Sequence, residues 1–458
     1  MIENDAFKLL LINLFHLNPD DIANILCTTF NKMMVLIVTL ADKHQACPYC
    51  GFTAPKIKEY VTKEITHSAL TTQKCIIKYR ARRYKCSCCG KTYYEFNPFV
   101  FKSQKILILT VHNILKDLKD FNETFTSVAR RYHVSPTSVS TIFDNHVDIG
   151  RNPLPEIINF DEVYAFKSEK SKYVCVLLDF KKQIPVDVLP NRKKEYLLNY
   201  FQKIPLEERK KVKYACSDMY EVYRDVVHKV FPSCCMLLDY FHLSQDFHRK
   251  MNEVRIKVMK GYKDNKASDE YYLLKKFNWL LFKNPEDEDK YGRLFDVERE
   301  RKYNSHFKSY MNYYDLRKKL LEINNDLTIC YSLKLELVDF YSKSTIDNAK
   351  VNLENLIRSC IDTNIDEMIA FSNNLINWKQ EIINSFTIVG TGYKVEADKG
   401  QVVVCNKKVN NAIIENRNKI IKCIKNNANG YTNWSRFRNR VMYVLDPNAT
   451  FSLEPREK

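Results

Sequence analysis

The sequence predicts a multidomain protein in which a small cysteine-rich module and a pair of short helices precede an α/β core that is interrupted by helices. Three observations support this architecture. Two Cys-x-x-Cys-Gly motifs lie within residues 41–100, strand and helix patterns alternate from about residue 155, and residues 251–400 are rich in Lys, Glu, Asn and Leu with helical periodicity. A chain of 458 residues has room for about two to four domains, each with its own core.

Composition and charge narrow the range of functions. The formal net charge is +17, which favours a polyanionic partner. The chain has 9 glycines and contains neither G-x-x-x-x-G-K-[ST] nor G-x-G-x-x-G, so we do not expect a reaction that depends on ATP or on a dinucleotide. The acidic start MIENDAF is unlike a secretory signal, and the apolar runs are shorter than the roughly 20 residues that span a membrane. We therefore expect a cytoplasmic protein without membrane contact, whose 15 cysteines are mostly reduced.

The two cysteine motifs predict a zinc site. CPYCG supplies Cys47 and Cys50, and CSCCG supplies Cys86 and Cys89. The glycine that follows each motif suits a turn with positive φ, in which backbone N–H groups point at the sulfurs. Four thiolates satisfy the tetrahedral coordination of Zn²⁺. The alternative is four buried or redox-inert cysteines that hold no metal.

A basic segment lies between the two motifs. KEYVTKEI and KCIIKYRARRYK have the pattern of strands, and the second carries a dense positive stripe. We expect this stripe to contact DNA phosphates. Its residues are Arg80, Arg82, Arg83 and Lys85.

Residues 122–147, NETFTSVARRYHVSPTSVSTIFDNHV, predict a helix-turn-helix. Thr126 is the expected N-cap of the first helix, and Ser135 with Pro136 begins the second. The second helix would be the recognition helix, with Thr137, Ser138 and Ser140 near its start. An ordinary helical hairpin is the alternative.

The core pattern runs from about residue 155. EIINFDEVYAF, KYVCVLLDF and IPVDVLP predict three consecutive strands, followed by the helix KKEYLLNYFQKIP, the strand VKYACSD, the helix YEVYRDVVHKVFP and a fifth strand, CMLLDYFHL. This order of elements is that of the ribonuclease H-like α/β fold. Helices are then expected throughout 251–400, where Trp279, Leu280 and Leu281 would be packing residues.

Three carboxylates stand out against this pattern. Asp161 and Asp218 follow buried strand patterns, and Glu415 opens a basic helix near the C-terminus. Carboxylates brought together at a sheet edge repel one another unless they share a hard divalent cation. Mg²⁺ held in this way is the usual machinery for attack on a phosphodiester. Glu162 should face the other side of the sheet. On the C-terminal helix we expect Asn418, Lys419 and Lys422 to share the face of Glu415 and to follow a phosphate backbone.

These segments resemble the ISL-three family of insertion-sequence transposases in RRYKCSCCGKTYYE, FDEVYAF, SDMYEVY, LLDYFHL and IENRNKIIKCIKNNANGYTNWSRFRNR. The resemblance implies an N-terminal zinc-binding domain, a helix-turn-helix and a ribonuclease H-like Asp-Asp-Glu domain with a helical insertion. It implies that Asp161, Asp218 and Glu415 are the catalytic triad. Asp239 and His242 match a further motif of the family without an assigned role.

The resemblance also implies an activity and partners. The protein would bind element ends and target DNA, and would cleave and transfer strands with Mg²⁺ (or Mn²⁺), in the bacterial cytoplasm at the nucleoid. Handling two ends together makes a homodimer the expectation. A DNA-binding regulator without catalysis, or a nuclease of this fold that never joins strands, are the alternatives.

The expected organisation has seven parts. These are an N-terminal segment (1–40), the zinc-binding domain (41–100), the helix-turn-helix (101–150), the first part of the core (155–250), the helical insertion (251–400), the C-terminal part of the core (401–446) and a tail (447–458).

Overall fold

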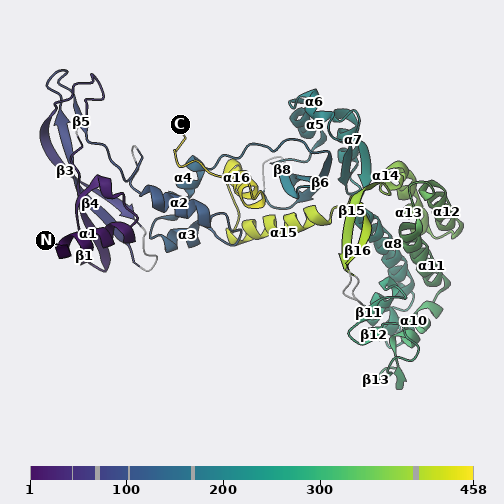
Figure 1. The fold of residues 1–458 in the computed structure, drawn as a ribbon. Coiled ribbons are helices and arrows are strands. Elements are labelled where there is room, and N and C mark those ends of the chain that lie inside the picture. Colours follow the sequence, from purple (N-terminus) through teal and green to yellow (C-terminus); the bar gives the residue numbers. More distant parts are fainter. Residues whose placement is uncertain are drawn as a thin grey trace.

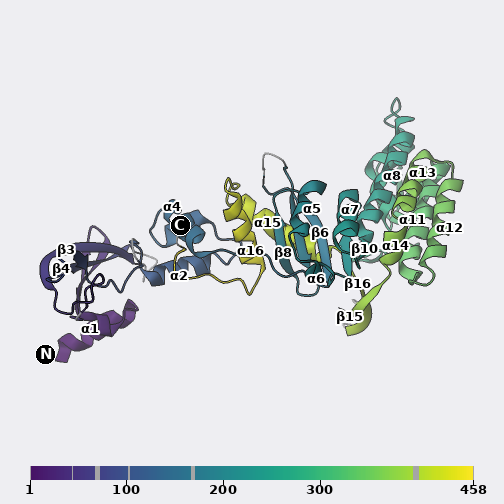
Figure 2. The ribbon, with the colours of Figure 1, turned by 90° about the horizontal axis from the view of Figure 1, so that it is seen from above.

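The computed structural model describes residues 2–456 apart from 44, 68–72, 102–103, 167–170 and 396–401. Figure 1 shows an elongated molecule with the cysteine-rich module at one end, a small helical unit and an α/β sheet in the middle, and a helical region at the other end. Figure 2 shows the same order from above. Among the described residues, no helix is both long and apolar enough to cross a membrane.

The N-terminal module is one mixed sheet covered by a helix. Its elements are α1 (Ile2–Leu14), a 3₁₀ turn (Pro19–Asp21), β1 (Ile22–Phe30), β2 (Met33–Leu40), β3 (Lys56–His67), β4 (Cys75–Lys85) and β5 (Thr92–Tyr94). The strand order is β1-β2-β4-β3, with β5 also on β4. Because β2 pairs in parallel with β4, the boundary expected at residue 40 falls inside one sheet.

A three-helix unit follows, with α2 (Ile108–Asp117), α3 (Phe125–Arg131) and α4 (Pro136–His146). Ser135 caps α4 and Pro136 occupies its first turn, as predicted. The predicted cap of α3 was wrong by two residues: Thr124 is the N-cap, because its side chain and that of Ser127 form a reciprocal capping box. The inner faces of α3 and α4 are apolar and buried, and their residues are Val128, Ala129, Tyr132, Val139, Ile142 and Phe143.

The central sheet has the predicted run of elements. These are β6 (Ile157–Val163), β7 (Val174–Asp179), β8 (Ile184–Leu189), α5 (Lys194–Gln202), the short α6 (Leu206–Arg209), β9 (Tyr214–Ser217), α7 (Glu221–Val230) and β10 (Cys235–Leu238). The order is β10-β9-β6-β7-β8. β6, β7 and β8 form an antiparallel meander, and β9 and β10 run parallel to β6. The fifth strand is shorter than predicted, because Asp239 accepts a hydrogen bond from the Phe241 N–H and starts a helix there.

Helices cover both faces of this sheet. On one face, α5 and α7 enclose a core around Phe160, Phe201 and Tyr223. On the other, α15 (Ala412–Asn427) and α16 (Trp434–Leu445) pack on β6, β7 and β8 around residues such as Val176 and Ile421. The chain therefore returns to the sheet after an excursion of more than 150 residues.

That excursion forms a separate helical body with its own core. Its helices are α8 (Tyr240–Lys260), α9 (Asp269–Lys276), a 3₁₀ helix (Asn278–Phe282), α10 (Tyr313–Glu322), α11 (Asn325–Lys343), α12 (Ala349–Asp362), α13 (Asp366–Asn377) and α14 (Lys379–Asn384). Its strands form three small hairpins, β11 (Glu288–Asp289) with β12 (Gly292–Arg293), β13 (Lys302–Asn304) with β14 (Ser309–Met311), and β15 (Ile388–Val395) with β16 (Val402–Lys408). Leu280 and Leu281 are fully buried in its core and Trp279 packs against it, as predicted.

Helix α16 joins the three-helix unit to the central sheet. The Arg440 guanidinium is 1% exposed and donates to the carbonyl oxygens of Asp120 (2.8 Å) and Glu123 (2.7 Å). Two residues earlier, Arg438 Nε donates to Oδ1 of Asp187 on β8 at 2.7 Å. This one helix therefore makes hydrogen bonds to the three-helix unit and to the sheet, and fixes the two relative to each other.

Candidate functional site

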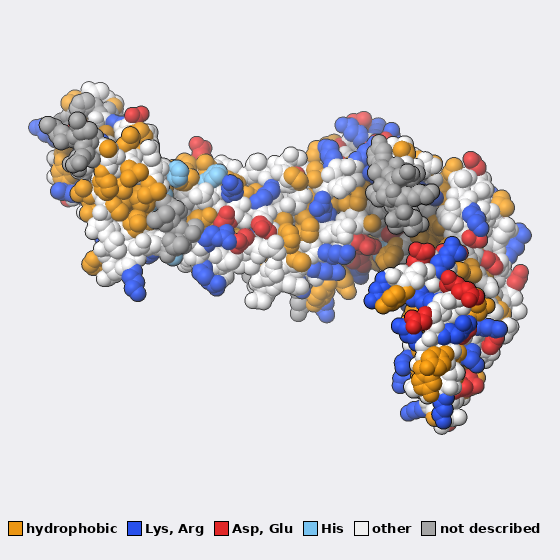
Figure 3. Space-filling view, turned by 60° about the horizontal axis from the view of Figure 1, so that its bottom comes forward, with side chains coloured by type: hydrophobic (Ala, Val, Ile, Leu, Met, Phe, Trp, Pro, Cys, Tyr) orange, Lys and Arg blue, Asp and Glu red, His pale blue; other side chains and the backbone are white. Residues whose placement is uncertain are grey.

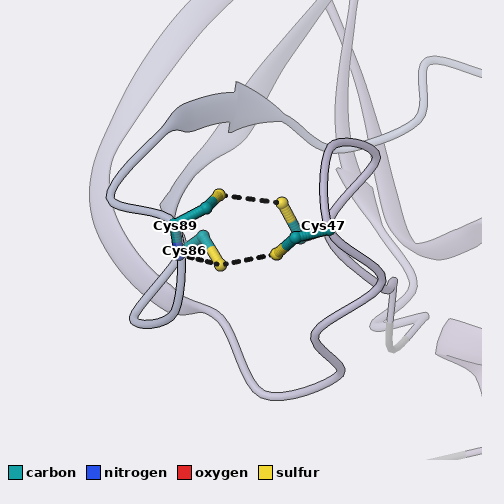
Figure 4. Close-up of side chains that lie close together, drawn as sticks. Cys47, Cys86 and Cys89 are labelled. Atoms are coloured by element: carbon teal, nitrogen blue, oxygen red, sulfur yellow. Dashed lines mark hydrogen bonds between the residues drawn. The ribbon is translucent and has the colours of Figure 1, made fainter.

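The four predicted cysteines form one group in the N-terminal module. Their sulfur atoms all lie within 4.8 Å of one another. Figure 4 shows the two turns facing each other, with Cys86 and Cys89 opposite the turn of Cys47. Gly51 and Gly90 have φ of 74° and 70°. Each donates its N–H to the carbonyl oxygen of the first cysteine of its motif, Cys47 and Cys86 respectively.

The sulfur geometry suits a tetrahedral ion. Cys47 Sγ lies 3.7 Å from Cys89 Sγ, and Cys50 Sγ lies 3.5 Å from Cys86 Sγ. Four sulfurs at about 2.3 Å from a zinc ion would be about 3.8 Å apart, which is close to these separations. The backbone N–H of Cys89 donates to Cys86 Sγ, and backbone donors lower the pKa of the Cys86 thiol. This cluster could therefore bind zinc.

In the central sheet, three aspartates form a row across neighbouring strands. Cys216 on β9 pairs in parallel with Asn159 on β6, and also with Leu237 on β10. Two residues after Asn159, Cys216 and Leu237 come Asp161, Asp218 and Asp239, respectively. Because side chains alternate along a strand with period two, the three carboxylates share a face and an edge of the sheet. Asp161 lies within β6, two residues before its end, whereas the sequence placed it at a strand end.

Burial and mutual repulsion make this row costly to ionise. Burial raises the pKa of Asp161 to about 7, and the nearby Asp218 carboxylate also raises it. Burial likewise raises the pKa of Asp218 to about 6 and raises that of Asp239. Burial and like charge therefore disfavour the ionised form of these carboxyl groups unless a cation is bound between them.

The fourth carboxylate arrives from the C-terminal helix. Glu415 lies in the first turn of α15, as predicted. His242, in the first turn of α8, stands between it and the sheet: His242 Nε2 is 3.8 Å from Glu415 Oε1 and 3.9 Å from Asp239 Oδ2. Among the described residues, the acidic group whose ligand atoms all lie within 4.8 Å of one another is Asp239, His242 and Glu415, rather than the predicted triad.

Two polar atoms at this centre are left for a ligand. Asp218 Oδ1 and His242 Nε2 are buried and meet no hydrogen-bond partner among the residues that the structure describes. Such atoms are costly unless something outside the chain satisfies them. Carboxylate oxygens with an imidazole are a donor set that divalent cations accept. The residues present therefore fit a divalent metal ion.

Asparagines tie α15 to the sheet beside these carboxylates. Asn418 Nδ2 donates to Asp161 Oδ2 at 2.7 Å. About two helical turns before Asn418, Asn411 Oδ1 accepts from Asn159 Nδ2 at 2.7 Å, and the Asn410 carbonyl accepts from the same amide at 2.8 Å. Asn418 is 5% exposed, so it does not share the solvent face of Lys419 and Lys422, as the sequence had suggested. The reason is that Asn411, Ile414, Asn418 and Ile421 follow the helical repeat and together face the sheet.

Glu162 faces the opposite side of β6 from Asp161, as predicted. It forms an ion pair with Arg192 and accepts a hydrogen bond from the Tyr223 hydroxyl at 3.2 Å. This side is the one covered by α5 and α7.

The residues predicted to contact DNA are not equally available. Arg80, Lys85, Thr137, Lys419 and Lys422 are exposed, and Ser138 is half-buried. Arg82 instead pairs with the buried Glu95 (2.8 Å), and Arg83 pairs with Glu59 (2.6 Å). Ser140 is 9% exposed and donates to the Thr137 carbonyl at 3.0 Å, so it faces the interior of the unit.

Sequence reasoning missed the positions of Asp239 and Asn418 at the acidic centre. A signal for Asp239 was present, because ACSD and MLLD place an aspartate directly after each of two consecutive strands. No local signal identified Asn418, since its partner is 257 residues away.

Comparison with known proteins identifies the family of the chain. A family model described as "Transposase", of the ISL-three type, matches residues 158–397, which is more than half of the chain. The match includes the row of three aspartates and ends before Glu415. The chain is also 19% identical over 409 residues to the transposase for insertion sequence element IS1001 of Bordetella parapertussis, covering 89% of this chain and 90% of that protein. The chain belongs to the ISL-three family of transposases.

Proposed function

We propose that this transposase binds the ends of an insertion sequence and catalyses metal-dependent DNA strand cleavage and strand transfer. The observation that carries the proposal is the row of Asp161, Asp218 and Asp239, with Glu415 brought against it by α15. The sheet order, a three-stranded meander with two strands parallel to its first, supports a ribonuclease H-like core interrupted by the helical region.

Asp161, Asp218 and Glu415 would hold Mg²⁺ or Mn²⁺, and Asp239 and His242 are further candidate ligands. A bound ion supplies Lewis-acid stabilisation of the phosphodiester oxygens and lowers the pKa of the attacking hydroxyl. The chain itself fixes the carboxylates: the sheet sets the spacing of Asp161 and Asp218, and Asn418 holds one oxygen of Asp161. Exchange of phosphodiester bonds needs no ATP, which agrees with the missing nucleotide loops.

The proposed DNA surface follows from charge and exposure. Arg80 and Lys85 on β4, Thr137 and Ser138 at the start of α4, and Lys419 and Lys422 on α15 are available to phosphates or base edges. Phosphate contacts of this kind supply affinity and fix register. The cysteine cluster would hold one Zn²⁺ and stabilise the module that carries Arg80 and Lys85.

The test uses purified full-length protein, labelled duplexes carrying the element ends, and Mg²⁺. Asp161→Asn and Asp218→Asn should bind the ends as the wild type does and lose nicking and joining. Binding of Mn²⁺, followed by its electron paramagnetic resonance signal, should weaken in parallel. Glu195→Gln, an exposed carboxylate on α5, is the matched control and should leave both readouts unchanged.

The outcomes separate the alternatives. Binding without cleavage by the wild type at any Mg²⁺ or Mn²⁺ concentration would support a DNA-binding regulator. Cleavage without joining would support a nuclease. Cleavage retained by Asp161→Asn would refute the assigned centre.

We further propose that the protein acts as a homodimer at the nucleoid of the bacterial cytoplasm, because two element ends must be processed together. Light scattering of the complex with one and with two ends would measure the number of chains bound.

A further inference from the structure

A cavity of about 580 Å³ opens directly beside the acidic centre. Asp239 and Glu415 form part of its wall. The remaining wall comes from the end of β10 and the first turn of α8, from α11 of the helical body, from Ser385 after α14, and from the end of β16 with the link into α15. The cavity therefore lies at the junction between the central sheet and the helical body, within the size range of about 300–1,000 Å³ that small-ligand sites occupy.

Part of the cavity wall is aromatic and apolar. It contains Tyr240 and Phe241 from α8, and Val338 and Tyr341 from α11. The rings of Tyr240 and Tyr341 are in contact, with centroids 3.8 Å apart. The Phe241 side chain is 49% exposed, so its ring is available for contact with a ligand.

Polar groups stand at one side of this wall. Lys408 ends β16 and Asn410 lies in the link that leads into α15. Lys408 Nζ lies 4.4 Å from the centre of the Phe386 ring. A site for a metal ion or a phosphate alone has no use for an aromatic wall. A flat ligand with two apolar faces and a polar edge would fit both the aromatic and the polar residues of the wall. A nucleobase has these properties.

The cavity is also placed where a base of the substrate could reach it. Phe241 adjoins His242 in the chain, and their ring centroids are 5.8 Å apart. A strand whose phosphate lies at the acidic centre has its neighbouring nucleotides within reach of the cavity that shares Asp239 and Glu415. Inside a duplex, however, a base cannot enter such a cavity without leaving the stack.

We propose that this cavity receives one unstacked nucleobase from a nucleotide next to the scissile phosphate, stacked against Phe241. The inference rests on the proposed function, since it needs a DNA strand at the acidic centre. It adds a binding site for a single base and gives the helical body a role in holding the substrate.

The experiment replaces one base at a time with 2-aminopurine, at each position within about three nucleotides of the mapped nick. The fluorescence of 2-aminopurine is quenched by stacking in duplex DNA. For full-length wild-type protein in Ca²⁺, which supports binding without chemistry, a fluorescence change should occur at a single position adjacent to the nick.

The variant Phe241→Ala should reduce this signal and slow nicking by about 5- to 150-fold, because base–aromatic stacking of about 1–3 kcal/mol is lost. Affinity for the duplex should change little. Phe241→Trp should restore both readouts. A mismatch at the responding position should partly rescue Phe241→Ala, since the base is then already loosened. Phe30→Ala, a 64% exposed phenylalanine in the N-terminal module, is the matched control.

Failure of this inference differs from failure of the proposed function. If the wild type nicks the ends but no position responds, or Phe241→Ala nicks at the wild-type rate, the base site is wrong and the catalytic assignment stands. If the wild type produces no nick at all, the proposed function is wrong, and the base site falls with it.

Discussion

The carboxamide of Asn418 donates to Oδ2 of Asp161 at 2.7 Å, which joins two residues separated by 257 positions. Asp161 lies on β6 and Asn418 on α15, the helix that carries Glu415. This bond holds the C-terminal helix in register with the sheet, so it controls where Glu415 meets the aspartates. It occupies Oδ2 of Asp161, while Oδ1 accepts the backbone N–H of Glu162 at 2.7 Å.

Replacing Asn418 should weaken both the fold and metal binding. Asn418→Ala removes a buried hydrogen bond to a carboxylate, and we expect a loss of about 1.5–3 kcal/mol in the free energy of unfolding. It also removes a donor that favours ionised Asp161, so Mn²⁺ affinity near neutral pH should fall. Urea denaturation and Mn²⁺ titration measure the two effects. Asn416→Ala, at an exposed position on the same helix, should change neither; equal losses in both variants would contradict the role given to Asn418.

The raised pKa of Asp161 predicts that the metal-free protein loses stability as pH rises. Below about pH 4 the carboxyl is protonated in both the folded and the unfolded chain, so it adds no pH dependence. Between that pH and the folded pKa of about 7, the folded chain keeps a proton that the unfolded chain has released. The free energy of unfolding therefore falls as pH rises through this window.

The measurement compares wild type with Asp161→Asn in EDTA at several pH values. Relative to Asp161→Asn, the wild type should lose unfolding free energy as pH rises from about 4 to 7, and the difference should then stay constant. Saturating Mg²⁺ should suppress the trend, because the ion replaces the proton on the carboxylate. A difference that does not vary with pH would show that Asp161 is not a buried, strained carboxyl.

The cysteine cluster predicts one zinc ion per chain. Cys47→Ser removes one of four thiolates, and we expect loss of the metal together with unfolding of the N-terminal module, because binding energy at such sites is folding energy. Elemental analysis measures the zinc content, and limited proteolysis measures the unfolding of the N-terminal module. Cys88→Ser is a close control, since Cys88 is exposed and lies beside Cys89 but outside the cluster. Wild-type protein that is folded and free of metal would disprove the zinc site.

The buried Arg440 should be a major support of the contact between the three-helix unit and the sheet. Arg440→Met leaves the carbonyl oxygens of Asp120 and Glu123 without this donor. We expect a cost of about 2–4 kcal/mol in thermal or urea unfolding, and faster proteolysis between α2 and α3. The exposed pair of Arg293 with Glu286 provides the comparison, and Arg293→Met should cost less than about 1 kcal/mol. Similar losses of stability in Arg440→Met and Arg293→Met would mean that α16 does not couple the three-helix unit to the central sheet.

The sequence by itself determined the local elements and the metal-ligand spacing. Short apolar runs identified the five central strands, Ser135 and Pro136 located the start of α4, and the paired C-x-x-C-G motifs specified the cysteine cluster. These features depend on residues close together in the chain, so a short window contains the information. The fifth strand was predicted to continue past Asp239, because the apolar run does not stop there. In the structure the Asp239 side chain caps a helix, which ends the strand.

Only the tertiary structure decided how distant residues meet. The parallel registers of β6, β9 and β10 align three aspartates that the sequence places 78 residues apart at the extremes. The packing of α15 turns Asn418 inward and leaves Lys419 outward, and the fold of α4 buries Ser140 while Thr137 stays exposed. The physical reason is that register and helix rotation are fixed by which apolar side chains are buried together, and those partners are far apart in the chain.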